Sequence, residues 1–284
     1  MHSHSLRKLA LLGLVAGALC SCGNSGSKDT IRIGLECAYI PFNWVAKNPG
    51  EFTLPIQNHP GTYADGYDIQ IAKRIAKQTG KKVEIVQTNW EALITDLQMG
   101  SIDAIIAGMT DTEARRKQIS FTDEYYRSEL VLITSKAVAQ AHQDPLSASD
   151  FKTVVNGQNV VSQVSTVTDE VIDVFASDYG AKHVTPVATF ALAAQDVVNG
   201  SSFAMTAELP VARSIVSQYA GLGILHIDQA ILGEYRAELG VSIGVRKDDT
   251  ELQSQINGVL ATIDAEERLK IMEAAVQRSA GVEA

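Results

Sequence analysis

The sequence predicts an α/β protein built of two lobes, and three observations support this prediction. Strand-like and helix-like segments alternate from Ile31 onward, which is typical of a parallel sheet with helical crossovers. The same alternation starts again near Leu130. About 260 residues remain once a short N-terminal leader is set aside, and that length suits two lobes with a sizeable core.

The elements of the first lobe follow from apolar periodicity and from the positions of glycine and proline. In order, we expect a strand at 31–35, a loop at 41–66, a helix from Asp68 to Gly80, a strand at 82–86, a helix at 90–97 that stops at Gly100, and a buried strand at 101–107. The loop is long for a compact domain, so it is either functional or an insertion.

The second lobe is expected to repeat this pattern. In order, we expect strands at 130–134 and 159–161, helices at 169–176 and 190–198, and a strand at 239–245. Asp249 then opens a helix whose apolar positions are Leu252, Ile256, Leu260 and Ile263. Charged residues are scattered singly over these helices, which is typical of solvated faces.

The N-terminus has the features of a secretory signal peptide. A short basic head precedes an apolar run at 9–19 that is too brief to span a bilayer. The run ends in Leu-Cys-Ser-Cys-Gly, which resembles a bacterial lipobox in which Cys22 becomes the acylated N-terminal residue. We therefore expect a signal peptide at 1–21 and a lipid-anchored tether at 22–29, whose small polar residues suit a flexible linker. Cys20 fits the lipobox less well, and the alternative is an ordinary cleaved signal.

Composition limits the chemistry and the partners of the exported part. The chain has 24 basic and 33 acidic residues and a formal net charge of −9, which argues against nucleic acid as a partner. Apart from Cys20 and Cys22, the sequence contains one cysteine, Cys37, so no internal disulfide is expected. No histidine or second cysteine lies at ligand spacing from Cys37. We therefore expect no metal and no cofactor, and we interpret Cys37 as a small buried residue.

Four segments in the first lobe carry a family resemblance. They are IRIG at 31–34 with YIPF at 39–42, GYDIQIAK at 66–73, IDAIIAGMT at 102–110 and ISFTDEYY at 119–126. In this order they resemble the amino-acid-binding subfamily of periplasmic solute-binding proteins, the bacterial extracellular solute-binding family 3 that serves ABC importers.

The resemblance implies a type II periplasmic-binding-protein-like fold, in which two α/β lobes are joined by two hinge strands and enclose the ligand when they close. Lobe 1 is then expected to contain residues 30–127 plus 243–284, and lobe 2 residues 128–242. The hinge fits the strands expected near Leu130 and Val241.

A free amino acid presents a carboxylate and an ammonium, so its pocket needs a cation and an anion. The family's carboxylate-binding arginine falls on Arg115, whose planar guanidinium can hold a carboxylate through two parallel hydrogen bonds. Thr112 is a credible N-cap for the helix that carries Arg115, and backbone N–H groups from Gly108 through Thr110 to Thr112 would point at the same anion. Without the resemblance, Arg115 would be interpreted as a solvated charge.

The second lobe is expected to complete the pocket. Glu208 falls where the family carries an aspartate after a strand, and it would pair with the ligand ammonium; its alternative role is that of an acid near a helix N-terminus. Ser165 and Thr166 would add hydroxyl and backbone donors to the carboxylate. The family usually shows Gly-x-x-Asp-Ala where this chain has GSSFA at 200–204, with Phe203 in the Asp position. Because of this departure, the correspondence between Glu208 and the family's aspartate is less well defined.

Recognition of the ligand side chain is assigned to the first lobe. Tyr39 and Trp90 match pocket-lining positions of the family, where an aromatic face can cover an aliphatic chain or a cation. Glu36 matches a position near the distal end of the ligand in some receptors for basic amino acids, and Asn43 is close to it in sequence. We therefore expect a polar or cationic ligand, arginine or lysine first. Phe42 is expected in the core.

Together these features predict a monomeric, lipid-anchored receptor on the periplasmic or extracellular face. It would capture a free amino acid by hinge closure for the permease subunits of an ABC importer, touching the membrane through its lipid alone and catalysing no reaction. One alternative is an enzyme on the same fold, similar to cyclohexadienyl dehydratase, with Glu36 or Glu208 as acid or base. The other is a surface adhesin or sensor.

Overall fold

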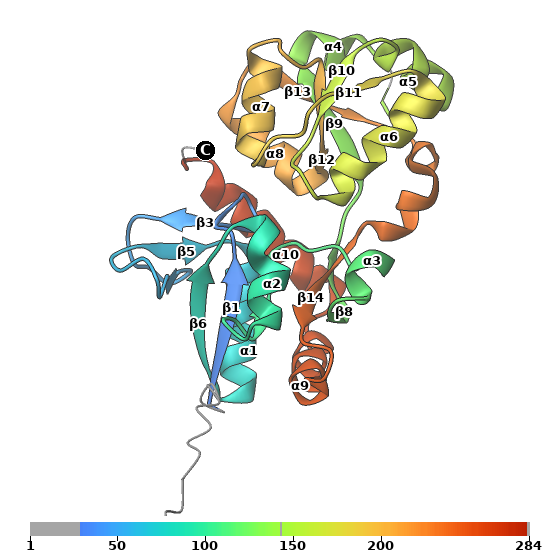
Figure 1. Cartoon of the computed structure of the whole chain (residues 1–284). Coiled ribbons are helices and arrows are strands. Elements are labelled where there is room, and N and C mark those ends of the chain that lie inside the picture. Colours follow the sequence, from blue (N-terminus) through green and yellow to red (C-terminus); the bar gives the residue numbers. More distant parts are fainter. Residues whose placement is uncertain (1–28, 143, 283–284) are drawn as a thin grey trace, which may run out of the picture.

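Two five-stranded sheets, one in each lobe, form the framework of the chain (Figure 1). The computed structural model describes residues 29–142 and 144–282. In spatial order, the sheet of the first lobe contains β6 (Lys82–Gln87), β1 (Thr30–Leu35), β7 (Ala104–Ile105), β14 (Gly240–Val245) and β8 (Ser120–Arg127). The sheet of the second lobe contains β11 (Lys182–His183), β10 (Asn159–Val161), β12 (Ala204–Glu208), β9 (Leu130–Ser135) and β13 (Leu222–His226). Parallel pairing of β1 with β6 and β7, and of β10 with β11 and β12, confirms the predicted α/β class.

Helices connect these strands. The first lobe has α1 (Tyr67–Thr79), the 3₁₀ helix η1 (Trp90–Ala92), α2 (Leu93–Gln98), α3 (Glu113–Arg116), α9 (Thr250–Leu260) and α10 (Ala265–Ser279). The second has α4 (Lys136–Ala141), α5 (Ala148–Val155), α6 (Val167–Tyr179), α7 (Phe190–Val198), α8 (Leu209–Gln218) and the 3₁₀ segment η2 (Gln229–Glu238). The predicted stop after α1 is confirmed, because Gly80 adopts a left-handed φ of 69° and its N–H bonds to the Ala76 carbonyl.

The two largest differences from the predicted helix boundaries are at α6 and α9. The helix expected at 169–176 is longer, because the Thr166 side chain caps α6 and Gly180 ends it with a φ of 75°. Helix α9 ends at Leu260, so Ile263 lies beyond it although its side chain is buried. Both differences concern helix ends, where hydrophobic periodicity carries the least information.

The loop expected at 41–66 contains three short strands that the sequence did not predict. They join β2 (Ala38–Tyr39) in a four-stranded sheet, in spatial order β2, β3 (Asn43–Ala46), β5 (Tyr63–Asp65) and β4 (Leu54–Pro55), and the rest of the segment lies mainly in turns and bends. Strands of two to four residues are too short to show a period of two, so turn residues dominated the pattern. The strand expected at 101–107 is likewise reduced to β7.

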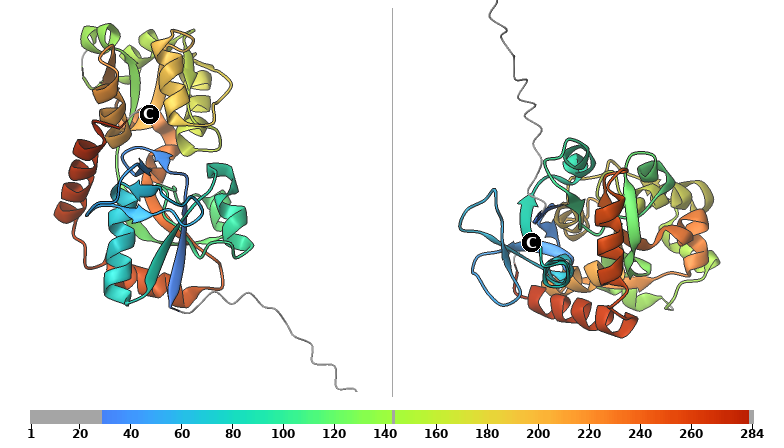
Figure 2. Two further views of the ribbon diagram at one scale, coloured as in Figure 1. Left: turned by 90° about the vertical axis from the view of Figure 1, so that its left-hand side faces the viewer. Right: turned by 90° about the horizontal axis from the view of Figure 1, so that it is seen from below.

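The lobes are joined by two crossing segments, as the predicted hinge requires. The chain passes from β8 to β9 through residues 128–129 and returns from η2 to β14. The sequence prediction placed the second boundary between the lobes between residues 242 and 243. Strand β14 already pairs with β8 of the first lobe at Gly240, so the chain re-enters the first lobe before that residue. Helix α10 adds a contact at the side of the molecule (Figure 2), where the hydroxyls of Ser279 and Ser214 of α8 share a hydrogen bond of 3.1 Å.

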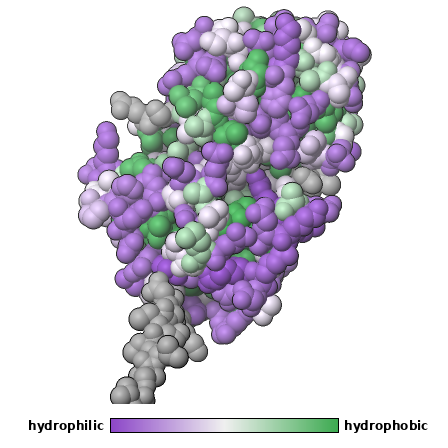
Figure 3. All heavy atoms as spheres, in the orientation of Figure 1, coloured by the Kyte–Doolittle hydropathy of each residue, from purple (hydrophilic) through white to green (hydrophobic). Residues whose placement is uncertain are grey.

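Figure 3 shows the distribution of hydropathy over one face of the molecule. Hydrophilic residues cover most of the face drawn in Figure 3, and hydrophobic ones form smaller groups. Cys37 is buried, as expected.

In the part of the chain that the structure describes, no helix has both the length and the apolar character needed to cross a membrane. The predicted signal peptide and Cys22 lie outside the described residues, as does the tether up to residue 28.

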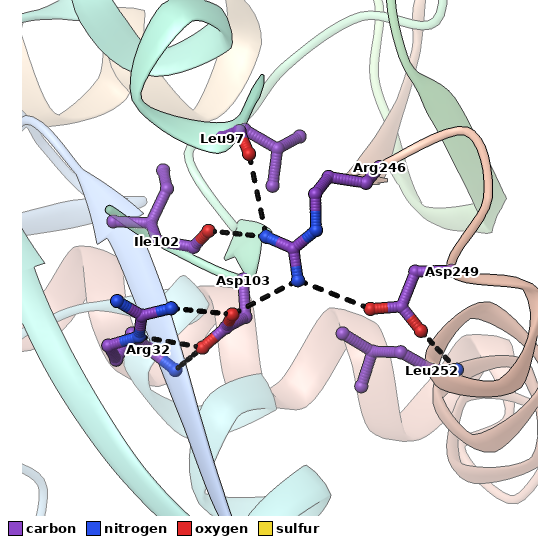
Figure 4. Close-up of polar contacts among 7 residues, drawn as sticks. All are labelled: Arg32, Leu97, Ile102, Asp103, Arg246, Asp249 and Leu252. Carbon is purple, nitrogen blue, oxygen red and sulfur yellow. Dashed lines mark hydrogen bonds and ion pairs between the residues drawn. The ribbon is translucent and has the colours of Figure 1, made fainter. Parts of the chain in front are cut away.

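One cluster of charges ties the first lobe together away from the lobe interface (Figure 4). The Asp103 carboxylate accepts hydrogen bonds from the backbone N–H and the guanidinium of Arg32 at 2.8 to 3.0 Å, and from Arg246 at 3.1 Å. Arg246 also donates to the Ile102 carbonyl and to Asp249, which caps α9. Burial alone would raise the pKa of Asp103, but the hydrogen bonds from both arginines outweigh it and hold the pKa below its usual value.

We expect Asp103→Asn to lower the free energy of unfolding by about 2 kcal/mol at neutral pH, because two guanidinium groups lose a shared carboxylate. When folding lowers the pKa of a carboxyl group, that group stabilises the folded protein at pH values above the pKa that it has in the unfolded chain. This contribution is lost as the pH falls through the lower pKa of the folded state. Urea unfolding at pH 7 and at successively lower pH checks both points: the difference between wild type and variant should shrink on acidification. A difference that stays constant with pH would contradict the assignment.

Candidate ligand-binding site

A small pocket with an empty volume of about 310 Å³ lies between the two lobes. The first lobe contributes Glu36, Tyr39, Trp90, Gly108, Thr110 and Arg115, and the second contributes Gln163, Thr166, Val167, Thr168, Phe190 and Glu208. The structure therefore brings together all of the residues expected at the ligand site except Ser165 and Asn43.

Arg115 reaches from the first lobe across to the second. One terminal nitrogen donates to the Thr110 carbonyl at 2.8 Å, and the other donates to the Ser165 carbonyl at 3.0 Å. The guanidinium lies over the Trp90 ring, 5.3 Å from its centre, and the Trp90 indole N–H donates to the same Ser165 carbonyl at 3.2 Å. Ser165 thus contacts the site through its backbone rather than through the hydroxyl that the sequence suggested.

The structure confirms one of the two roles predicted for the segment that precedes Arg115. The Thr112 side chain accepts the backbone N–H of Arg115 at 3.2 Å, which confirms the expected N-cap. The expected anion contact does not hold for the Gly108 N–H, because this group donates to the Tyr125 hydroxyl at 2.8 Å. Gly108 instead provides space: it has a φ of 61°, and a Cβ there would lie 2.6 Å from the Tyr39 ring.

Glu208 and Tyr39 form a second contact between the lobes. The Tyr39 hydroxyl donates to the Glu208 carboxylate. The Tyr39 ring stacks on Phe42 of its own lobe and on Phe190 of the other, with both pairs of ring centres 4.9 Å apart. Burial raises the pKa of Glu208, and the hydrogen bond from Tyr39 opposes this shift. The Glu208 side chain lines the pocket and makes no capping hydrogen bond to α8, although the residue directly precedes that helix.

Glu36 is the second acid of the pocket and is almost fully buried. Its carboxylate accepts a hydrogen bond of 3.1 Å from the Gln163 side-chain amide, whose other bond goes to the Ala188 carbonyl. Burial raises the pKa of the Glu36 carboxyl to about 7, although the bond from Gln163 lowers it. In this arrangement the carboxylate has an uncharged partner, so a cation that entered the pocket would find a favourable site beside it.

Helix α6 presents its N-terminus to the pocket through Thr166, Val167 and Thr168. The Thr166 hydroxyl accepts the N–H of Asp169 at 3.1 Å and donates to the Gln163 carbonyl at 2.7 Å. The hydroxyl is therefore engaged in capping the helix. What α6 offers an anion is its N-terminal dipole and the peptide N–H groups of its first turn.

Asn43 lies in the core beside the site and not at its surface. Its amide nitrogen donates to Asp68 at 2.8 Å, and its oxygen accepts the backbone N–H of Cys37 at 2.8 Å. Closeness in sequence to Glu36 suggested a ligand contact, but β2 and β3 form a hairpin that turns Asn43 inward. Phe42 lies in the core, as expected.

Sequence reasoning missed four residues that line the pocket. Gln163 stands in a segment that was singled out for its two neighbours Ser165 and Thr166, so its position carried a signal. Phe190 opens a predicted helix and gave no sign of pairing with Tyr39. Val167 and Thr168 were missed because α6 begins earlier than its apolar periodicity indicates.

The pocket has the chemistry to bind a small zwitterion. It holds one guanidinium, two carboxyl groups and aromatic faces from both lobes. None of the described histidines lines it, and the described residues contain no group of three or more His, Cys, Asp or Glu side chains that could hold a metal ion. Charged groups of both signs in a space between two hinged lobes suit capture of a polar solute by closure.

Fold and site together define a two-lobed solute-binding protein. The chain belongs to the bacterial extracellular solute-binding proteins, family 3, whose sequence pattern matches residues 31–275. It is 25% identical over 274 residues to the L-arginine-binding protein of Pseudomonas aeruginosa, covering 93% of this chain and 94% of that protein. It is also 25% identical over 258 residues to the lysine/arginine/ornithine-binding periplasmic protein of Escherichia coli, covering 90% of each.

Solved structures agree with the fold. One is an amino acid ABC transporter substrate-binding protein, AbpA, from Streptococcus pneumoniae bound to L-arginine. Its TM-score to this chain is 0.70 at 22% identity, and the match covers 90% of this chain and 98% of that one. The predicted type II architecture with two lobes is therefore confirmed.

Proposed function

We propose that this protein captures a free cationic amino acid, arginine before lysine, and delivers it to an ABC importer. The observation that carries the proposal is the presence in one pocket of Arg115, Glu208 and Glu36. A cationic amino acid carries a carboxylate, an α-ammonium and a distal cation, so each of its charges finds an opposite charge. The names of the relatives from Pseudomonas aeruginosa and Escherichia coli support the same ligand class.

In the proposed complex, the ligand carboxylate binds Arg115 and the N-terminus of α6. The α-ammonium pairs with Glu208, and the aliphatic part lies against Tyr39 and Trp90. The distal cation then pairs with Glu36. A planar guanidinium can also donate to the Gln163 side-chain oxygen, which favours arginine over lysine.

Closure follows from the same contacts. The contacts that bridge the lobes include those of Arg115 with Ser165 and of Tyr39 with Glu208. A zwitterion adds bridges between lobes wherever it contacts both, so it binds the closed form more tightly and shifts the population toward that form. The importer would then recognise the closed form.

The proposal includes a place in the cell. The lipobox-like segment supports acylation of Cys22, a residue outside the described part, and a short tether to the envelope membrane. The word periplasmic in the name of the Escherichia coli relative supports the same compartment. Mass spectrometry of the protein from membranes tests this: a diacylglyceryl adduct on Cys22 is expected.

A ligand screen tests the proposed function. The purified protein is heated with each of the twenty amino acids, ornithine, citrulline, cystine and prephenate, because a ligand of the native state raises the melting temperature. Arginine should give the largest shift and lysine a smaller one. A shift with neutral amino acids alone would reject the cationic class. Turnover of prephenate, or no response to any amino acid, would reject the receptor function.

We expect Glu36→Gln to weaken arginine binding at pH 8 about tenfold or more, because the distal cation loses its charged partner. Citrulline, which lacks that cation, should lose little. In the wild type, ligand binding favours the ionised form of Glu36, whose pKa burial raises to about 7, so affinity should fall as the pH drops below about 7. Calorimetry from pH 5 to 8 checks this, and a pH profile unchanged in the variant would contradict it.

A further inference from the structure

Asp68 is a fully buried carboxylate that lies beside the pocket without lining it. It is the second residue of α1. One of its oxygens accepts the Tyr125 hydroxyl at 2.7 Å, and the other accepts the Asn43 amide at 2.8 Å. Both of these partners are uncharged, and burial raises the pKa of the Asp68 carboxyl well above its usual value although the two hydrogen bonds oppose this shift.

Each partner of Asp68 also accepts a hydrogen bond from the backbone of a different loop beside the pocket. Asn43 accepts the backbone N–H of Cys37 at 2.8 Å. Tyr125 accepts the backbone N–H of Gly108 at 2.8 Å. The carboxylate thus lies at the centre of two short chains of hydrogen bonds that end on loop backbones.

The two loops need such support. Cys37 stands between Glu36 and Tyr39 and has a φ of 56°, which residues with a side chain seldom adopt. Gly108 also has a positive φ, and its backbone lies so close to the Tyr39 ring that a Cβ would overlap it. A shift of either loop would therefore move the wall of the pocket.

We propose that Asp68 is a positioning residue for the ligand pocket. Through Asn43 and Tyr125 its carboxylate holds the loop that carries Glu36 and the loop that carries Gly108 in the arrangement that binds the ligand. An aspartate suits this task because its two oxygens each accept a hydrogen bond, one from Tyr125 and one from Asn43. The inference rests on the proposed function for its ligand, L-arginine.

The pair Asp68 and Asn43 permits a test by exchange. In Asp68→Asn, the new amide can accept from only one side, so either Tyr125 or Asn43 loses its acceptor. In the double variant Asp68→Asn with Asn43→Asp, the new carboxylate accepts from both Cys37 and the new amide. The new amide oxygen still accepts from Tyr125. The double variant therefore restores every one of these hydrogen bonds, and its carboxyl group lies at residue 43 instead of residue 68.

Calorimetry with L-arginine should show binding at least about tenfold weaker in Asp68→Asn and within about threefold of wild type in the double variant. Hydrogen–deuterium exchange at 36–42 and 106–111, without ligand, should rise in the single variant and return in the double one. Asp103→Asn is the matched control for affinity: it removes another carboxyl group of the first lobe, one that does not line the pocket, and we expect its affinity for L-arginine to stay at the wild-type value.

Three outcomes decide the question. Wild-type affinity and exchange in Asp68→Asn would overturn the inference while leaving the proposed function intact. If Asp68→Asn does not fold, Tyr125→Phe replaces it: this variant keeps the ring and removes the bridge to Gly108, so faster exchange at 106–111 than at 36–42 is expected, and equal exchange would overturn the inference. If the wild type binds no amino acid, the proposed function fails, and the exchange data still decide whether Asp68 positions the loops.

Discussion

Replacing Arg115 by alanine is expected to weaken amino-acid binding by more than about 2 kcal/mol, roughly 30-fold. The guanidinium is the cation of the pocket and contacts both lobes through carbonyl oxygens 2.8 and 3.0 Å away. Its loss would remove the proposed partner of the ligand carboxylate and one contact that favours closure. Isothermal titration calorimetry with L-arginine measures the effect on a variant shown by circular dichroism to be folded.

Two variants make this prediction specific. Arg116→Ala removes the neighbouring arginine, which is exposed and paired with Asp111, and it should leave affinity within about twofold of wild type. Arg115→Lys keeps the charge but loses the planar pair of donors, so we expect an intermediate affinity. An Arg115→Ala variant that is folded and binds arginine as tightly as wild type would refute the assignment of the carboxylate site.

Glu208→Gln is expected to have the second large effect, a loss of about 2 kcal/mol or more in affinity for every amino acid that binds. The substitution preserves the shape of the side chain and removes the charge that the α-ammonium requires. Because all amino acids carry that ammonium, ligand preference should change little. This separates Glu208 from Glu36, whose replacement should affect cationic ligands alone.

The contact between Glu208 and Tyr39 requires a control of its own. Tyr39→Phe removes the hydroxyl that bonds to Glu208 and keeps the ring that stacks on Phe42 and Phe190. We expect a much smaller loss than for Glu208→Gln, because the bond between the lobes is lost and the ammonium partner stays. Equal losses in the two variants would mean that Glu208 acts by holding the lobes together and not by binding the ammonium.

The family resemblance placed Arg115 and Glu208 in the site, and the structure puts both of them at recognisable junctions of the chain. Arg115 follows a buried strand and a threonine that caps its helix, and Glu208 ends a strand just before a proline-containing helix start. The expectation for Asn43 rested on a different argument and was wrong. Closeness along the chain placed it near Glu36, whereas the β2–β3 hairpin directs it to Asp68 in the core.

Local periodicity and the positions of glycine were enough to predict the class of the fold and the helix stops, and the family resemblance indicated which charged residues line the pocket. Which groups contact one another depends on the tertiary structure. Gln163 pairs with Glu36 and Phe190 stacks on Tyr39 across more than one hundred positions of sequence, as the lobes come together. Such contacts depend on how two lobes close, and no local pattern encodes that geometry. The small sheet of β2, β3, β5 and β4 was not predicted for a related reason: its strands are too short to show a period of two, and only their pairing defines them as strands.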